Sequence, residues 1–241
     1  AGASSRGQKF ASQNAECVFI SAPTKIAVKK LVAGIRHNLV KEGKDPNSVL
    51  IYTMLAIVVD ETDEKAQAKF QEYQQYGSYD GGLTLASGWS GVDFSQFRPT
   101  DQVEYIQTNA IQSMLQSYVE ADPDKIWTIE EIAHWTSIGG NGPVIIGSPT
   151  TVADRLQEWV EETGIDGFNL AYILAHKSFE DVVEFVVPEL QRRGVYQTEY
   201  AAGTLREKLF GQGPLLAENH RGASFRYHSQ QIKPLVVAEK A

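Results

Sequence analysis

The sequence predicts an α/β protein in which helices cover a parallel sheet. Two observations support this prediction. Short apolar runs alternate with longer amphipathic segments, and the apolar runs are rich in the β-branched residues typical of buried strands. At 241 residues the chain is also long enough to bury a substantial core.

The first part of the chain contains two strand–helix units. We expect a loop over residues 1–7, a short helix to about residue 16 and a buried strand over 17–20. An apolar stripe at helical spacing follows, formed by Ala27, Leu31, Ile35 and Leu39. The continuous apolar run at 49–58 indicates a strand buried on both faces, and the acidic residues at 60–64 begin the next helix.

The regular pattern stops between residues 77 and 142, which we interpret as an insertion. Residues 77–101 are rich in Gly, Ser and aromatic residues without clear periodicity, so we expect a long loop there. Thr128 is expected to cap a short helix, and the glycine-rich residues 139–142 form a turn. Another helical stripe is predicted from Val103, Ile106, Ala110, Met114 and Tyr118.

A third unit follows the insertion. The apolar residues 143–146 precede Ser148, which is placed to cap a helix that has Pro149 at its first position and ends at Gly164. The inner face of this helix is predicted to contain Val152, Leu156 and Val160. Residues 166–170 are expected to form its strand partner.

The last helix is predicted to begin at a Ser178 cap and to be kinked by Pro188. Residues 195–241 are interpreted as an irregular tail with one helical turn at about 204–209. The pattern therefore contains roughly three βα units. This number alone does not distinguish part of an eight-unit barrel from a small open sheet.

Composition excludes several classes of protein. With 22 basic and 30 acidic residues the net charge is -8, which argues against nucleic acid and anionic membranes as main partners. Cys17 is the single cysteine, so neither an intrachain disulfide nor a cysteine metal cluster is expected. The sequence contains no metal-ligand spacing, dinucleotide fingerprint, P-loop or serine-hydrolase elbow.

Four motifs occur in a specific order: AGASSRGQKFASQNAECVF at the start, GSPTTVADRLQEWVEETGIDGFNLAY from Gly147, then VVPELQRRG and EYAAGTLREKLFG. Together they resemble the bacterial-luciferase-like flavin monooxygenases. Within that superfamily they are similar to the branch of nitrilotriacetate monooxygenase, pristinamycin IIA synthase and dibenzothiophene sulfone monooxygenase.

The resemblance implies a (β/α)8 TIM barrel with a late insertion. This chain would be its C-terminal portion, from the turn after strand five to unit eight. It would form a single domain over 1–241, with the insertion at 77–142 and the tail at 195–241. The implied activity is that of a two-component monooxygenase in which a separate flavin reductase supplies reduced FMN and O2 oxygenates a small organic substrate. A cytoplasmic homo-oligomer is expected for the full-length protein.

The resemblance also implies a cofactor site. The family turn reads roughly Ala-Gly-x-Ser-x-x-Gly, and its serine lies near the flavin phosphate; the matching position is Ser4, with Ser5 and the backbone of Ala3 as helpers. A hydroxyl and N–H groups before a helix favour an anion; without the resemblance a simple helix cap would be the preferred interpretation of Ser4, and with it phosphate binding is favoured. The catalytic residues stay unknown, since the family's histidine and tyrosine on early strands have no counterpart here.

Other side chains have weaker claims to a role. Tyr172 and His176 follow a predicted strand, where barrel active sites lie, although a lone histidine is more often structural. The aromatic residues Trp89, Phe94 and Phe97 could cover a substrate or the flavin ring, or could form a satellite core cluster. His37 is expected on the surface of its helix.

A second hypothesis comes from a different class of function. The chain could be a truncated, non-catalytic relative that acts as an interaction or assembly partner. Without the earlier strands, a partial barrel would leave a sheet edge and apolar helix faces exposed. The upstream coding sequence would distinguish the two hypotheses.

Overall fold

The computed structural model describes residues 4–103 and 126–226. The helical stripe predicted from Ile106 to Tyr118 lies outside the described residues, and so does Ala3. By their contacts the residues group into two compact units, 1–198 and 199–241. None of the helices in the described ranges is long and apolar enough to cross a membrane.

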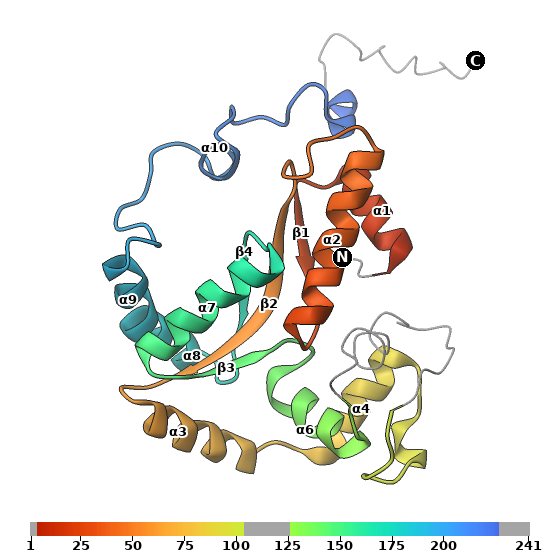
Figure 1. Ribbon diagram of the computed structural model, residues 1–241, viewed down its shortest axis with the longest axis vertical. Helices are drawn as coiled ribbons and strands as arrows, with labels where there is room; N and C mark the ends of the chain where they lie inside the picture. The colour runs from red at the N-terminus through yellow and green to blue at the C-terminus, as the bar shows by residue number, and fades with distance from the viewer. Residues whose placement is uncertain (1–3, 104–125, 227–241) are drawn as a thin grey trace, which may run out of the picture. The chain divides into compact units, whose positions relative to one another are not determined.

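The first unit contains a four-stranded sheet whose strands all run parallel, as predicted (Figure 1). Its strands are β1 (Cys17–Ile20), β2 (Leu50–Val59), β3 (Val144–Gly147) and β4 (Gly167–Ala171). The long strand β2 is central. Its first half pairs with β1 on one edge and with β4 on the other, and its second half pairs with β3.

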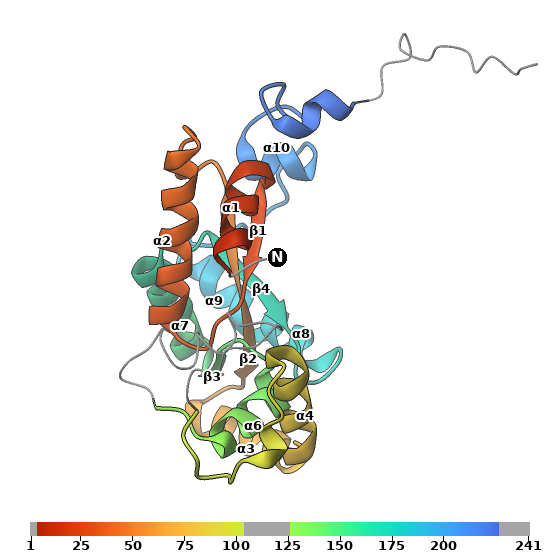
Figure 2. The same cartoon turned by 90° about the vertical axis from the view of Figure 1, so that its right-hand side faces the viewer.

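Helices cover one face of this sheet, and Figure 2 shows α2 (Lys25–Lys41) and α7 (Pro149–Thr163) on the same side. The side chains of β2 that point toward these helices alternate along the strand and are buried: Ile51, Leu55, Ile57 and Val59. Helix α1 (Ser5–Asn14) packs on α2, and α3 (Asp63–Gln75) packs on β3. Helix α1 begins within the stretch expected to be a loop, because Ser4 already caps it.

The opposite face of the sheet is less covered. Phe19 of β1 is 54% exposed, and its ring centroid lies 5.6 Å from that of Tyr52 on β2. The prediction that the apolar run at 49–58 is buried on both faces therefore holds for Leu55–Val59 only. At Tyr52 and Met54 the second face is only half-buried.

The insertion corrects one prediction. Residues 79–90, expected to be part of a long loop, form the helix α4 (Tyr79–Ser90). Ser78 caps this helix by accepting the N–H of Gly81 at 3.0 Å. Gly82 lets α4 lie against α6 (Ile129–Gly139), because a Cβ at that position would lie 2.0 Å from the carbonyl oxygen of Ala133. This tertiary contact stabilises a helix that local propensity does not favour.

The insertion has a core of its own that is rich in aromatic residues. Phe94, in the short 3-10 helix η1 (Phe94–Gln96), and Trp127 are buried there, with Trp89 and Trp135 packed against them. This arrangement supports the structural interpretation of the aromatic segment as a satellite core. Thr128 caps α6 in a capping box with Glu131, which confirms that prediction.

The segment after the insertion follows the prediction up to β4. Ser148 caps α7, Pro149 occupies its first turn, and Gly164 ends it with a positive φ of 72°. Val152 and Leu156 are buried as expected, whereas Val160 is 39% exposed.

The last helical segment differs from the prediction. It consists of α8 (Lys177–Asp181), a π-helix (Val182–Val186, η2) and α9 (Val187–Arg192). Ser178 lies inside the first turn instead of capping it, because its Oγ accepts the N–H groups of Ile173 and Leu174. Pro188 is in the first turn of α9, directly after the irregular π turn.

The second unit is described by itself. It contains α10 (Leu205–Phe210) and the 3-10 helix η3 (Arg221–Phe225), and α10 is the helical turn predicted at about 204–209. Thr204 and Glu207 form a capping box at its start.

Candidate functional site

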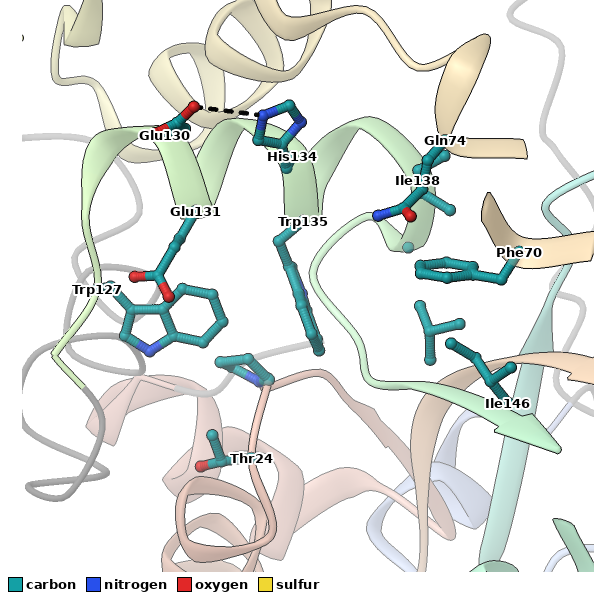
Figure 3. Close-up of a pocket in the computed structure, with 13 residues that line it drawn as sticks. Thr24, Phe70, Gln74, Trp127, Glu130, Glu131, His134, Trp135, Ile138 and Ile146 are labelled. Atoms are coloured by element: carbon teal, nitrogen blue, oxygen red, sulfur yellow. Dashed lines mark ion pairs between the residues drawn. The ribbon is translucent and has the colours of Figure 1, made fainter. Parts of the chain in front are cut away.

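A cavity of about 830 Å³ lies beneath helix α6, and we refer to it as the α6 cavity (Figure 3). Segments that are far apart in the sequence contribute to its wall: the turn after β1, helix α3, helix α6 and strand β3. The lining residues are Pro23, Thr24, Phe70, Gln74, Trp127, Glu130, Glu131, His134, Trp135, Ile138, Gly139, Val144 and Ile146.

Large apolar side chains form most of the wall. The rings of Trp127 and Trp135 meet edge to face, with centroids 5.4 Å apart and an interplanar angle of 81°. Figure 3 shows both rings and the ring of Phe70, which comes from α3, around the space beneath α6. Such a lining suits an apolar or aromatic molecule.

The cavity lies at the carboxyl end of a strand. Pro23 and Thr24 follow β1 directly, and Thr24 caps α2 by accepting the N–H of Ala27 at 3.2 Å. The hydroxyl of Ser21 donates to the carbonyl of Asn141 at 2.8 Å, which joins the turn after β1 to the turn before β3. In parallel α/β folds, ligands bind at the carboxyl ends of the strands.

Three ionisable side chains of α6 line the cavity. The Oε2 atom of Glu131 accepts the backbone N–H of Thr128 at 2.9 Å, so the capping box holds this carboxylate in place. Glu130 and His134 are more than half exposed, and 3.8 Å separates their nearest O and N atoms. The indole N–H of Trp135 is buried and has no hydrogen-bond partner among the described residues.

Ser4, the cofactor residue expected from the resemblance, lies at the N-terminus of α1. Its Oγ accepts the N–H of Gly7 at 3.2 Å, so it does cap the helix. Ser5 is the first residue of α1, and the first turn contains Arg6 but no acidic residue. Neither serine lines the α6 cavity.

Tyr172 and His176 follow β4 and do not line the α6 cavity either. His176 has a φ of 65° and is the only residue other than glycine with a positive φ in the described ranges. The N–H of Lys177 donates to the carbonyl of Ala175 at 2.9 Å, so His176 is the centre of a strained γ-turn. The ring of Tyr172 packs on Phe179 instead, with centroids 5.9 Å apart.

A second cavity, of about 610 Å³, lies between α7, β4 and α9. Its wall is mainly aliphatic and includes Val160, Leu170 and Leu190, and polar residues such as Gln157 and Glu161 also line it. Trp89, Phe94 and Phe97, the aromatic residues that could have covered a ligand, line neither cavity.

The remaining ionisable groups offer little chemistry. Burial, followed by the nearby carboxylates of Glu16 and Asp166, raises the pKa of the Cys17 thiol, which makes it a poor nucleophile. The described residues include no group of three or more His, Cys, Asp or Glu that could hold a metal ion. His37 is exposed on α2, as predicted.

The sequence did not single out the α6 cavity. Its residues come from four separate segments, and none of them forms a recognisable motif. One signal was present: Trp127 and Trp135 flank the capping residues Thr128 and Glu131, which places two large rings around one short helix.

Residues 1–167 match the family model of the luciferase-like monooxygenases. The dimethyl-sulfide monooxygenase of Hyphomicrobium sulfonivorans is 38% identical over 227 residues, which cover 94% of this chain and 47% of that protein. The long-chain alkane monooxygenase of Geobacillus thermodenitrificans is 34% identical, over 96% of this chain and 49% of its own length. Nitrilotriacetate monooxygenase component A of Aminobacter aminovorans is 31% identical, over 87% of this chain and 47% of that protein.

Solved structures agree with the sequence matches. The crystal structure of DmoA from Hyphomicrobium sulfonivorans superposes with a TM-score of 0.80 at 35% identity, covering 97% of this chain and 51% of that one. A riboflavin lyase crystallised with modified FMN and riboflavin gives a TM-score of 0.80 at 29% identity, covering 94% of this chain and 50% of that one.

The chain spans about half the length of the curated relatives it matches. The match to the family model extends from the Ser4 turn through β1, β2, the insertion and α7 to the start of β4. The fold is the parallel α/β arrangement of the matched structures. The chain therefore belongs to the luciferase-like monooxygenase family.

Proposed function

We propose that this chain is the C-terminal part of an FMN-dependent, two-component monooxygenase that oxygenates a small organic substrate. The observation that carries the proposal is the match of residues 1–167 to the luciferase-like monooxygenase family. The open sheet is consistent with part of a barrel: in the described ranges β1 and β4 each pair only with β2, and Phe19 on the less covered face is 54% exposed.

The residues at the start of α1 fit the phosphate of FMN. The first N–H groups of a helix have no partner within it, so the N-terminus attracts an anion. The hydroxyl of Ser4 accepts one hydrogen bond from Gly7 and still has its own proton to donate to a phosphate oxygen. No acidic side chain in the first turn repels an anion, and Arg6 adds a positive charge.

The division of roles follows from these residues. Ser4, with Ser5 and the backbone of Ala3, would hold the phosphate. Bound reduced FMN would supply the electrons with which O2 oxygenates the substrate. The protein's part is to fix the cofactor, to exclude water and to hold the substrate. A separate flavin reductase would supply the reduced cofactor, and the full-length protein would be a homo-oligomer.

The test is a titration of the 241-residue chain with FMN and with riboflavin, which lacks the phosphate, followed by flavin fluorescence. We expect FMN to bind more tightly than riboflavin. Ser4→Ala should weaken FMN binding by about 10- to 100-fold, because a hydrogen bond to a charged group contributes about 1.5–3 kcal/mol. It should leave riboflavin binding unchanged.

Ser78→Ala is the matched control, since it removes the serine cap of a different helix, α4. Absence of FMN binding, or equal affinity for the two flavins, would contradict the proposal and favour a relative that acts by association. If Ser78→Ala weakens FMN binding as much as Ser4→Ala, the effect comes from loss of stability and the phosphate role is wrong.

A further inference from the structure

We infer that the second cavity, between α7, β4 and α9, binds a small molecule by its alkyl chain. We refer to it as the α7–α9 cavity. It shares no described wall residue with the α6 cavity, and neither Ser4 nor Ser5 lines it. The site is therefore separate from the cofactor residues of the proposed function.

Aliphatic side chains from several elements form most of the wall of the α7–α9 cavity. Ile57 comes from β2, Leu170 from β4 and Leu156 from α7. The last helical segment adds further aliphatic side chains: Val182, Val186, Val187 and Leu190. Branched side chains present an irregular surface of methyl groups, and a flexible alkyl chain can follow such a surface more closely than a flat ring. The chemistry of the wall therefore favours an alkyl chain.

The mouth of the cavity combines exposed apolar surface with polar groups. Val160, Val195 and Tyr196 line the cavity, yet 39%, 53% and 46% of their surfaces are exposed to water. Gln157 and Glu161 line it as well, and Glu161 is exposed. An alkyl chain that covers the apolar side chains removes apolar surface of both partners from water, and a polar end group of the ligand can stay at the mouth.

Polar contacts hold the two sides of the cavity in place. Arg193, which follows α9, donates to the carboxylate of Asp154 at 2.6 Å and to the side-chain oxygen of Gln157 at 2.8 Å, both on α7. The N–H of Val195 donates to the carbonyl of Leu190 at 3.1 Å and so turns the chain back after α9. A ligand therefore meets a site that is already formed, which lowers the cost of ordering side chains on binding.

The π-helix contributes directly to the wall. Val182 and Val186 are its first and last residues and both line the cavity, whereas Val183 of the same turn is 65% exposed and does not. π turns within helices occur frequently at functional sites. The irregular turn is a second, independent observation that points to a binding role at this position.

The size of the cavity suits a small molecule better than a peptide. Its volume of about 610 Å³ lies within the range of small-molecule sites. One turn of an α-helix with its side chains, about 10–12 Å across and 5.4 Å long, already occupies about 400–600 Å³. The cavity thus has room for about one helical turn, which is too little to hold a partner helix.

The test is a titration of the 241-residue chain, without flavin, with 1-butanol, 1-hexanol and 1-octanol, followed by NMR of its methyl groups. We expect saturable shifts of the methyl signals of Val160, Leu170 and Val186, which line the cavity. The signals of Val28 and Leu39, which α2 buries in the core, should stay unchanged. Each buried methylene group should tighten binding about fourfold, so 1-octanol should bind about 15-fold more tightly than 1-hexanol.

Two variants fill the cavity from opposite sides. Val160→Trp on α7 and Val195→Trp after α9 each place a large ring at the mouth, where partial exposure lets the fold accommodate it. Each should weaken binding of 1-octanol at least about tenfold, equivalent to the loss of about two buried methylene groups. Val183→Trp is the matched control, because it adds the same ring at an exposed position that does not line the cavity, and it should leave the affinity unchanged. Circular dichroism checks that all three variants fold.

Three outcomes would overturn the inference. The first is methyl shifts that do not saturate, or that occur at Val144 and Ile146 of the α6 cavity instead. The second is an unchanged affinity for 1-octanol in both filling variants when they are folded. The third is a dimer, measured by sedimentation, that Val160→Trp dissociates while 1-octanol does not bind, because a second copy would then cover this wall. None of these measurements involves FMN, so each outcome is distinguishable from failure of the proposed function.

Discussion

The sheet with its covering helices and the insertion at 77–142 belong to one unit but are held together differently. The sheet and its helices have a mainly aliphatic core, and several of their ion pairs join distant residues, such as Lys25 with Glu158 at 3.1 Å and Arg193 with Asp154 at 2.6 Å, besides pairs three or four positions apart. The insertion has an aromatic core. Its ion pairs in the described ranges join residues three or four positions apart, Arg98 with Asp101 and His134 with Glu130.

This difference has a consequence for stability. Long-range contacts make the sheet and its helices cooperative, because one broken contact affects several elements. In the described ranges, the insertion depends mainly on the crossing between α4 and α6 and on local contacts, with few contacts to the sheet such as the one from Ser21 to Asn141. We therefore expect the insertion to open more readily than the sheet, which hydrogen exchange can resolve segment by segment.

The largest loss of stability is expected from a substitution in the sheet. Leu55 of β2 is fully buried, so Leu55→Ala should lower the free energy of unfolding by about 2–5 kcal/mol. Chemical denaturation measures this loss, and hydrogen exchange should accelerate in β1, β2 and β4 more than in α4 and α6. Leu85→Ala on α4, where the side chain is 45% exposed, is the control and should change stability by less than about 0.5 kcal/mol. Equal acceleration in both regions would show that they form one cooperative unit.

The next effect is expected at the helix crossing of the insertion. Gly82→Ala places a Cβ 2.0 Å from the carbonyl oxygen of Ala133, and relieving this overlap should cost about 1–3 kcal/mol. Exchange should accelerate in α4 and α6 first. Gly88→Ala on the same helix meets nothing within 4 Å and should instead stabilise α4 by about 0.5–1 kcal/mol. Destabilisation of similar size by both variants would show that the loss does not come specifically from the crossing at Gly82.

Substitution of two arginines, one with long-range contacts and one with a local contact, allows the stabilities that these contacts provide to be compared. Arg36 donates to the carbonyls of Pro46 and Gly164 and to the carboxylate of Asp166, so Arg36→Met should cost about 1–2 kcal/mol. Arg98 contacts only Asp101 in the described ranges and its side chain is 84% exposed, so Arg98→Met should cost less than about 0.5 kcal/mol. Thermal denaturation of both variants measures the difference, and similar losses would contradict the comparison.

The smallest effect is expected in how the stability of the protein depends on pH. Hydrogen bonds from Arg192 and then Arg193 lower the pKa of Glu189 to about 2 from its usual 4.5. Because the folded protein holds the charged form, Glu189 stabilises it above pH 4.5, and this contribution is lost as the pH falls toward 2. Glu189→Gln should therefore flatten the decline of the melting temperature over that interval.

Glu180→Gln is the control for the pH experiment, since Glu180 is exposed on α8 and has no ion pair in the described ranges. An equal flattening by Glu180→Gln would show that the decline reports overall charge and not the contact between Glu189 and the two arginines.

The same comparison explains what could be predicted from the sequence. The strands and helices of the sheet were predictable, because burial against two layers imposes periodic apolar residues such as Ile51 and Leu55. Helix α4 was missed because glycines at 81, 82 and 88 lower helix propensity, and its stability comes from the crossing at Gly82. Ser178 was misassigned because a serine just before an apolar stripe resembles a cap.

The candidate site was predictable only in part. The resemblance pointed to Ser4, and the structure shows that Ser4 is at a helix N-terminus, while phosphate binding stays a prediction. The α6 cavity was not predictable, because Thr24, Phe70 and Trp135 lie on three separate elements. Residues that gather only through tertiary folding have no common spacing in the sequence.

The π-helix at Val182–Val186 determines which way the following residues face. A π turn contains one residue more than an α turn, so it acts as a one-residue insertion within a continuous helical segment. If the same residues formed regular α-helix instead, α9 would be rotated by about 100° about its axis relative to the residues before the turn. Leu190 would then leave the core, and Glu189 and Arg193 would no longer face α7. The extra residue of the π turn is therefore what keeps Leu190 against the core and Arg193 toward Asp154 of α7.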